Sequence, residues 1–295
     1  MTVHDASDVY AVEVTDISLQ FGGLHALSGV SLALAPGETV GLVGTNGSGK
    51  TSLLNCISGI YHPQQGSIRI RGELTIGKAP HRVSALGVGR TLQSVETIRE
   101  MLVLNYVMLG RHQQQRGTVF RYAVGWAQVS GAEANERRLA MECMESLGVE
   151  QAANLRMSEI PYGMAKMVDL ARVLLGKPHI VLLDEPASGL STDERVKISE
   201  VLRTVGEDPE RAMIVVEHDL LLASRVCQNL LVLSAGAPIA YGPPEQVLND
   251  QKVIDELLGG AALDMSSVAA ASSDAAVLPA DPEFSAPATT SETES

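Results

Sequence analysis

The chain has 295 residues, 45% of them hydrophobic, which is enough for one large domain or two medium ones with a real core. Its formal net charge of −13 argues against non-specific binding to nucleic acid. No apolar run reaches the roughly 18 to 20 residues that cross a bilayer, and the amino terminus lacks the pattern of a signal peptide, so a cytoplasmic location is expected. Three widely spaced cysteines indicate neither a disulfide framework nor a zinc site.

The first part of the chain predicts antiparallel strands. Residues 12–15 and 30–34 alternate between apolar and polar side chains, and Phe21-Gly22-Gly23 interrupts the pattern between them. Phe21 is one of only three phenylalanines. Beside two glycines its ring could be exposed and stack on a flat base, although packing in the core is an equally good interpretation.

The stretch Gly44-Thr45-Asn46-Gly47-Ser48-Gly49-Lys50-Thr51 follows an apolar run at 39–43 and precedes a helical pattern at 52–57. Glycines at these spacings let successive backbone N–H groups point at phosphate oxygens, and a helix starting near Gly49 adds its positive end. Lys50 is then expected to reach the β- and γ-phosphates, and the Thr51 hydroxyl to bind Mg²⁺. A chance glycine loop is the alternative, and the strand–loop–helix context disfavours it.

The middle of the chain changes character. Residues 67–71 predict a further strand and residues 80–86 a short helix ending at Gly87. From about residue 96 to residue 175 the patterns are helical; within them Leu139, Cys143 and Leu147 recur every four residues, and Gly148 follows as a carboxyl-terminal cap. We therefore expect a helical subdomain inserted into a nucleotide-binding core.

Two apolar strands predicted farther along end in chemically active residues. Residues 180–183 lead into Asp184-Glu185, and residues 212–216 lead into Glu217-His218-Asp219. Nucleotide hydrolysis needs one carboxylate for Mg²⁺ and a second group to orient or deprotonate the attacking water, roles that suit Asp184 and Glu185. His218 could donate to the γ-phosphate, although a lone histidine at a strand end is more often a turn residue. No Asn-Lys-x-Asp motif occurs, which argues against a Ras-like GTPase and favours ATP.

The end of the chain divides into a folded part and a tail. A hairpin is predicted at 230–242 and helices at 244–258. Beyond Gly260 the composition becomes Ala, Ser, Thr, Pro and acids. We expect one domain over residues 10–260 and a disordered acidic tail over 261–295.

Together these motifs resemble the ATP-binding cassette (ABC) ATPases, over about residues 10 to 260. The resemblance implies an α/β fold: a P-loop NTPase core with an antiparallel β subdomain and an inserted α-helical subdomain. It makes Phe21 the aromatic that stacks on adenine, Gln93 in Arg90-Thr91-Leu92-Gln93 the Q-loop residue that acts in catalysis and on the metal, and His218 the switch histidine. Asp184 becomes the metal carboxylate and Glu185 the catalytic base. The nucleotide-contacting residues of the Walker A loop are then Gly44, Asn46, Gly47, Ser48, Gly49, Lys50, Thr51 and Ser52.

Within that family the chain looks most like the ATPase subunits of branched-chain amino acid and urea importers, although related exporter ATPases share several of the same stretches. Two departures stand out. The signature stretch, usually similar to Leu-Ser-Gly-Gly-Gln, is here Ile160-Pro161-Tyr162-Gly163-Met164, so Tyr162 and Gly163 are left to contact the ATP of the opposite subunit. Ser191 stands where the D-loop commonly has Asp.

The resemblance implies ATP and Mg²⁺ as cofactors and an ATP-hydrolysing motor of a membrane transporter. The expected partners are a second ABC ATPase subunit in a heterodimer, two transmembrane permease subunits at the inner face of the membrane and, indirectly, a solute-binding protein. Two other interpretations stay open: an exporter ATPase, and an ATP-binding subunit with little turnover. A cassette ATPase of DNA repair or translation is disfavoured, because the chain lacks heptads, zinc cysteines and basic patches.

Overall fold

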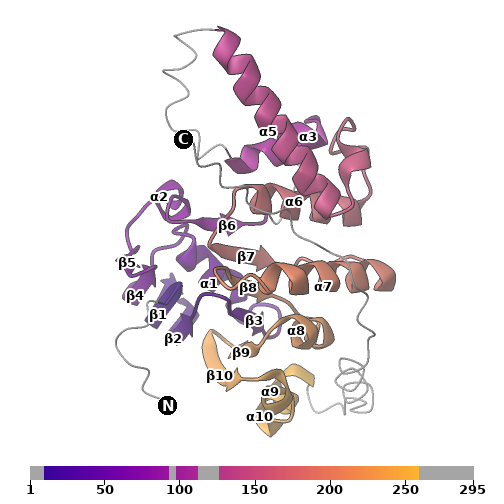
Figure 1. The fold of residues 1–295 in the computed structure, drawn as a ribbon. Helices are drawn as coiled ribbons and strands as arrows, with labels where there is room; N and C mark the ends of the chain where they lie inside the picture. The colour runs from indigo at the N-terminus through magenta and orange to yellow at the C-terminus, as the bar shows by residue number, and fades with distance from the viewer. Residues whose placement is uncertain (1–9, 93–97, 112–125, 259–295) are drawn as a thin grey trace, which may run out of the picture. The chain divides into compact units, whose positions relative to one another are not determined.

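The computed structural model describes residues 10–92, 98–111 and 126–258, which form two β-sheets and the helices around them (Figure 1). The tail predicted for 261–295 and Gln93 lie outside the described residues. Of the helices in the described ranges, none combines the length and apolar character that a membrane span requires.

The smaller sheet is antiparallel, as the alternating pattern predicts. Its order is β2-β1-β4-β5, and β1 pairs with both β2 and β4. The strands are longer than the alternation alone indicated, because bulges interrupt the period without ending the pairing. Their bounds are β1 Val12–Phe21, β2 Leu24–Leu34, β4 Gln65–Ile70 and β5 Glu73–Leu74.

The larger sheet has six strands in the order β10-β9-β3-β8-β7-β6, parallel except for β10. Every residue of β3, β7 and β8 is buried, since both faces of this sheet are covered. The strands are β3 Thr39–Val43, β6 Val88–Arg90, β7 Ile180–Asp184, β8 Ala212–Val216, β9 Asn229–Ser234 and β10 Ala237–Gly242.

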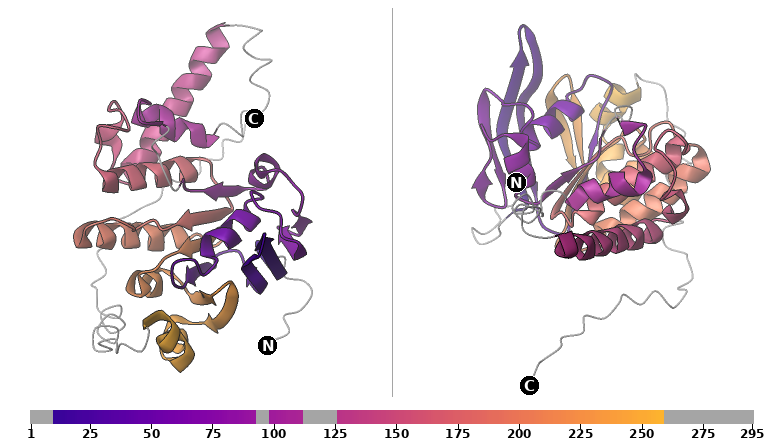
Figure 2. Two further views of the ribbon diagram at one scale, coloured as in Figure 1. Left: turned by 180° about the vertical axis from the view of Figure 1, so that it is seen from behind. Right: turned by 90° about the horizontal axis from the view of Figure 1, so that it is seen from above.

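Helices cover both faces of the six-stranded sheet. Leu53, Leu54 and Ile57 of α1 join side chains of both sheets in one apolar core, so α1 packs between the sheets. The antiparallel strands and α7 lie on opposite sides of the six-stranded sheet (Figure 2). The helices of this part are α1 Lys50–Ile57, α2 Pro80–Ser84, α7 Thr192–Gly206, α8 Leu220–Val226, α9 Pro244–Leu248 and α10 Gln251–Leu258.

The remaining helices have a core of their own, which supports the predicted helical subdomain. They are α3 Val103–Met108, α5 Trp126–Ser146 and α6 Tyr162–Leu175, with 3₁₀ turns η2 Leu109–Arg111 and η3 Glu150–Ala152. In the part of α5 whose side chains the structure describes, Ala140 and Met144 are fully buried. Leu139 and Cys143, with Leu147 just after the helix, are partly buried and pack against the same core. The residues that the sequence pattern indicated therefore contact the helical core, and the positions next to Leu139 and Cys143 are buried more deeply.

Candidate nucleotide-binding and hydrolysis site

The strand order brings the predicted motifs to one edge of the six-stranded sheet. β3 lies beside β8, and β8 beside β7, all parallel, so their carboxyl ends meet. The phosphate loop follows β3, Asp184-Glu185 ends β7, and Glu217-His218 follows β8. Ligands of parallel α/β sheets bind at such an edge.

Two glycines of the phosphate loop, Gly44 and Gly49, lie where there is no room for a side chain. Gly49 has φ 104°, and a Cβ there would lie 2.6 Å from the Ala26 carbonyl oxygen. A Cβ on Gly44 would lie 2.2 Å from the Leu233 carbonyl oxygen. The Ser48 hydroxyl is buried and has no hydrogen-bond partner among the described residues, which fits an anionic ligand that would accept from it. Asn46, Gly47 and Ser52 complete the loop and the first turn of α1.

Lys50 lies inside its own loop. Its Nζ donates to the carbonyl oxygens of Gly44 at 2.7 Å and Thr45 at 2.8 Å, and the residue is only 6% exposed. Burial lowers the pKa of the Lys50 amine, while the carboxylates of Glu185 and Asp184 oppose this change. A bound polyphosphate would offer this buried ammonium anionic hydrogen-bond acceptors in addition to the two carboxylates.

Asp184 divides its two carboxylate oxygens between two partners. Oδ1 accepts from the Thr51 hydroxyl at 3.4 Å, and Oδ2 pairs with Arg90 Nη2 at 3.1 Å. Arg90 Nη1 also donates to Asn55 Oδ1 at 2.7 Å and Ser58 Oγ at 2.8 Å, at the end of α1. The hydroxyl and carboxylate of Thr51 and Asp184 are the hard oxygen donors that Mg²⁺ prefers. The role of Arg90 was not predicted, because nothing in its sequence position shows that its guanidinium turns back onto Asp184.

Glu185 has a strained backbone. Its φ is 49°, a left-handed conformation that costs a non-glycine residue on the order of 1 kcal/mol or more. Three hydrogen bonds hold it there: Glu185 N donates to the Val216 carbonyl oxygen at 3.0 Å, and its own carbonyl accepts from Lys166 Nζ at 3.1 Å and from Ser188 N at 3.2 Å. Strain that neighbouring contacts impose is common at catalytic positions.

The end of β8 combines a buried carboxyl group and an exposed imidazole. The side chain of His218 is 49% exposed, whereas that of Glu217 is fully buried. Glu217 Oε1 accepts from Ala187 N at 2.9 Å, and Oε2 has no hydrogen-bond partner among the described residues. Burial raises the pKa of Glu217. The carboxyl group thus ties β8 to the segment that follows Glu185, a contact that sequence reasoning missed.

Phe21 is 46% exposed, so the structure favours the exposed of the two interpretations that the sequence left open. Its ring meets Tyr61 edge to face, with centroids 5.1 Å apart and planes at 74°. Tyr61 was not predicted to lie near the site. Its contact holds the Phe21 ring without covering it.

The signature stretch lies at the start of α6. Gly163 is buried, and Tyr162 is 53% exposed with Lys166 Nζ 5.5 Å from its ring centroid. A Cβ on Gly189 would lie 2.9 Å from the Tyr162 ring, so this turn packs on the segment after β7. Among the described residues no hydrogen bond or ion pair joins it to the phosphate loop, whereas Lys166, one turn along α6, donates to the Glu185 carbonyl oxygen.

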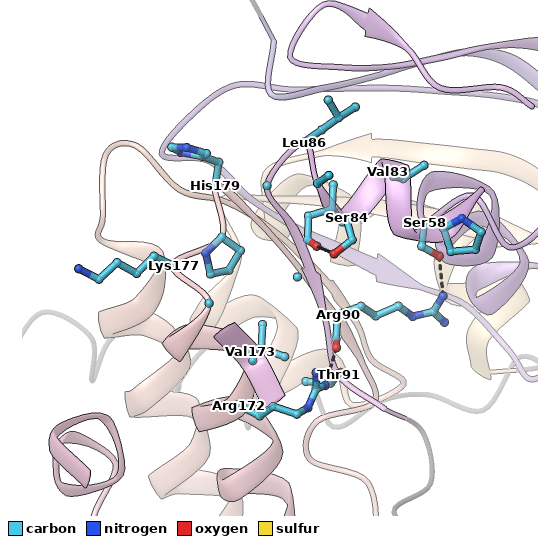
Figure 3. Close-up of a pocket in the computed structure, with 18 of the residues that line it drawn as sticks. Ser58, Val83, Ser84, Leu86, Arg90, Thr91, Arg172, Val173, Lys177 and His179 are labelled. Atoms are coloured by element: carbon cyan, nitrogen blue, oxygen red, sulfur yellow. Dashed lines mark hydrogen bonds between the residues drawn. The ribbon is translucent and has the colours of Figure 1, made fainter. Parts of the chain in front are cut away.

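A cavity of about 820 Å³ lies next to Arg90 and Thr91 (Figure 3). Its walls come from α2, β6, the end of α6 and the turn after it, and include Val83, Leu86, Val173 and His179. It is separate from the phosphate loop, whose residues do not line it.

A phosphate loop, a buried lysine and paired acids at the next parallel strands define the fold and site of a P-loop nucleoside triphosphatase. The family described as "ABC transporter" matches residues 27–188. The high-affinity branched-chain amino acid transport ATP-binding protein LivG of Escherichia coli K12 is 33% identical over 250 residues, covering 85% of this chain and 98% of LivG. The chain belongs to the ABC transporter family, as an ATP-hydrolysing subunit.

Solved structures agree on the fold. A nucleotide-free ATP-binding cassette from an ABC transporter matches with a TM-score of 0.74 at 24% identity, over 85% of this chain and 99% of the other. A dimeric ATP-binding cassette in a post-hydrolysis state, bound to ADP and Pi, matches with a TM-score of 0.66 at 25% identity, over 79% of this chain and 98% of the other. The predicted α/β fold with an antiparallel sheet and a helical part is confirmed.

Proposed function

We propose that this chain hydrolyses ATP to drive import of branched-chain amino acids or similar small polar solutes. The observation that carries the proposal is the match to LivG, which extends over nearly the whole of that protein rather than over the phosphate loop alone. The buried Lys50 and the Thr51 hydroxyl beside Asp184 support it.

In this proposal Lys50 binds the β- and γ-phosphates, and Mg²⁺ is held by Thr51, Asp184 and Gln93. Bound Mg²⁺ would neutralise charge on the phosphate oxygens. Glu185 orients or deprotonates the attacking water, and His218 donates to the γ-phosphate. Phe21 stacks on adenine with its exposed ring face.

The proposed assembly contains a second ABC ATPase subunit and two permease subunits, with a solute-binding protein acting on the permeases. Tyr162 and Gly163 face the ATP of the second subunit. The permeases hold this chain at the inner face of the membrane and dock beside Gln93, which lies outside the described residues, and beside the helical part. Among the described residues, the cavity next to Thr91 offers a recess (Figure 3).

A second candidate is a subunit that holds ATP with little turnover at one of the two composite sites. The signature stretch favours it, because Pro161 and Met164 replace the hydroxyl and amide that usually contact the triphosphate. This candidate differs from the first proposal in how ATP hydrolysis is divided between the two composite sites.

The test is ATP hydrolysis by the purified complex of this chain with its permeases in liposomes, with binding protein and leucine added. We expect leucine-loaded binding protein to stimulate turnover and Glu185→Gln to reduce it at least a hundredfold, since the base is lost while the shape is kept. Glu200→Gln, an exposed change on α7, is the control and should keep full activity. If no branched-chain amino acid stimulates turnover, the proposed substrate class is wrong. If Glu185→Gln keeps full turnover, the catalytic assignment is wrong.

A further inference from the structure

Three polar residues form a buried cluster in the helical part. Asp169 is 2% and Tyr106 1% exposed. The Tyr106 hydroxyl donates to Asp169 Oδ1, and Arg172 Nε donates to the same carboxylate oxygen at 2.8 Å and to the Tyr106 oxygen at 3.0 Å. Burial, and then the Asp169 carboxylate, raise the pKa of Tyr106, so its hydroxyl stays a donor. Buried ion pairs seldom add net stability to a fold, so a gain in stability does not by itself explain why this cluster is present.

The cluster reaches out of the helical part and holds the end of β6. Arg172 Nη2 donates to the carbonyl oxygen of Arg90 at 2.7 Å, and Leu92 N donates to Asp169 Oδ2 at 2.7 Å. Figure 3 shows the Arg172 side chain ending at this point of the backbone. The peptide groups on both sides of Thr91 are therefore held by α6.

The residues held in this way in turn hold Asp184. Asp184 N donates to Thr91 Oγ1 at 3.2 Å, and Arg90 Nη2 pairs with Asp184 Oδ2 at 3.1 Å. Arg90 also reaches the end of α1 through Ser58 (Figure 3). Asp184 Oδ2 is occupied by Arg90, which leaves Oδ1 facing Thr51. A shift of the Thr91 backbone would therefore move both anchors of the Asp184 carboxylate together.

We propose that Tyr106, Asp169 and Arg172 are positioning residues for the metal carboxylate Asp184, acting through Arg90 and Thr91. The proposal rests on the proposed function in one respect, namely that Asp184 binds Mg²⁺ with ATP. It connects α6, whose first turn faces the partner's ATP in the proposed dimer, to the metal carboxylate of the same chain. A cluster that merely holds the helices together would stabilise the fold without affecting metal binding.

The experiment measures the affinity of the full chain for ATP by calorimetry, once with Mg²⁺ and once with EDTA. The ratio of the two dissociation constants is the gain that Mg²⁺ provides. In Asp169→Asn the side chain keeps its shape, but an NH2 group replaces one of the two carboxylate oxygens. The single remaining oxygen cannot accept from Leu92 N and from the Tyr106–Arg172 pair at once. Loss of one such hydrogen bond corresponds to roughly a fivefold to tenfold smaller Mg²⁺ gain.

Two further variants make the result specific. Asp208→Asn is the matched control, because Asp208, whose side chain is 37% exposed, forms the same kind of i,i+3 ion pair with Arg211, at 3.0 Å; its Mg²⁺ gain should equal that of wild type. Tyr106→Phe keeps the ring and removes only the hydroxyl; we expect about a threefold smaller gain. Affinity in EDTA should stay within about twofold of wild type in all three, since Lys50 and its loop are untouched.

The outcomes separate the inference from the function that it rests on. A lowered melting temperature with a wild-type Mg²⁺ gain in Asp169→Asn and Tyr106→Phe would show a structural role only and overturn the inference. If Asp169→Asn does not fold, Tyr106→Phe decides in the same way. Absence of ATP binding by the wild-type chain would overturn the proposed function, and the inference with it.

Discussion

At the scale of single residues, charge in this site is balanced by near neighbours. The buried Lys50 amine has the carboxylates of Asp184 and Glu185 around it, and Asp184 is paired with Arg90. A phosphate or a metal ion would therefore enter a site whose charges are already nearly compensated. Such preorganised charges need little rearrangement when a ligand binds.

Glu217 is the exception, and it makes stability depend on pH. Its pKa is raised by burial, so the folded state keeps a proton that the unfolded state releases. The stabilisation that the protonated Glu217 carboxyl contributes is therefore complete below the ordinary glutamate pKa, about 4.3. It is lost as the pH rises through the raised pKa of the folded state.

We expect Glu217→Gln to stabilise the chain at pH 8 by about 1 kcal/mol and to have little effect near pH 4. The neutral amide loses the desolvation cost of the carboxylate, and its oxygen can still accept from Ala187 N. Urea unfolding at both pH values measures this. Glu207→Gln, an exposed change beside Arg203, is the control and should show no such pH dependence; a variant less stable than wild type at pH 8 would contradict the argument.

At the scale of elements, the start of α7 connects Ser191 with Gly163 of the signature stretch, two residues that the sequence pattern treated separately. Ser191 caps the helix: its Oγ accepts from Glu194 N at 3.4 Å, and Glu194 Oε2 accepts from Ser191 N at 2.9 Å. Glu194 in turn lies against α6, where a Cβ on Gly163 would be 2.2 Å from its Oε1. Gly163 is thus required by packing as well as by any contact with ATP.

Two replacements of Ser191 should distinguish its role as the amino-terminal cap of α7 from its role as the D-loop residue. Ser191→Ala removes the cap and should destabilise the chain by about 1 kcal/mol, or roughly 2–4 °C in Tm. Ser191→Asp keeps a cap acceptor and introduces the usual D-loop residue, but it cannot donate to Glu194 Oε2 as the Ser191 hydroxyl does, so its Tm should lie between those of Ser191→Ala and wild type. Differential scanning fluorimetry measures both, with Ser224→Ala, a hydroxyl within α8, as the control. An equal Tm for wild type and Ser191→Ala would show that the cap contributes nothing.

At the scale of the whole molecule, the signature stretch predicts two unequal sites in the proposed heterodimer. One composite site combines this chain's Lys50 and Glu185 with the partner's signature. The other combines the partner's Walker residues with Pro161, Tyr162 and Met164. Losing a hydroxyl and an amide should cost about 1–3 kcal/mol per hydrogen bond in the transition state, or roughly ten- to a hundredfold in rate.

Replacing the catalytic glutamate of one subunit at a time in the reconstituted complex measures this difference. Glu185→Gln should abolish most turnover, whereas the equivalent change in the partner should have a much smaller effect. Equal losses would refute the asymmetric interpretation. Fast hydrolysis by a homodimer of this chain would show that Pro161 and Met164 are no handicap.

Local sequence determined the strands, the phosphate loop and the acids at the ends of β7 and β8, because apolar runs, glycine spacing and strand-end polar residues act over a few neighbours. Tertiary structure decided which side chains meet. Arg90 pairs with Asp184 across 94 positions, and Asp169 reaches Leu92 across 77. It also made Ala140 and Met144 more deeply buried than Leu139 and Cys143 on α5, since α3 and α6 determine which side of that helix is covered most. Contacts of that kind depend on how distant elements pack, which no local pattern encodes.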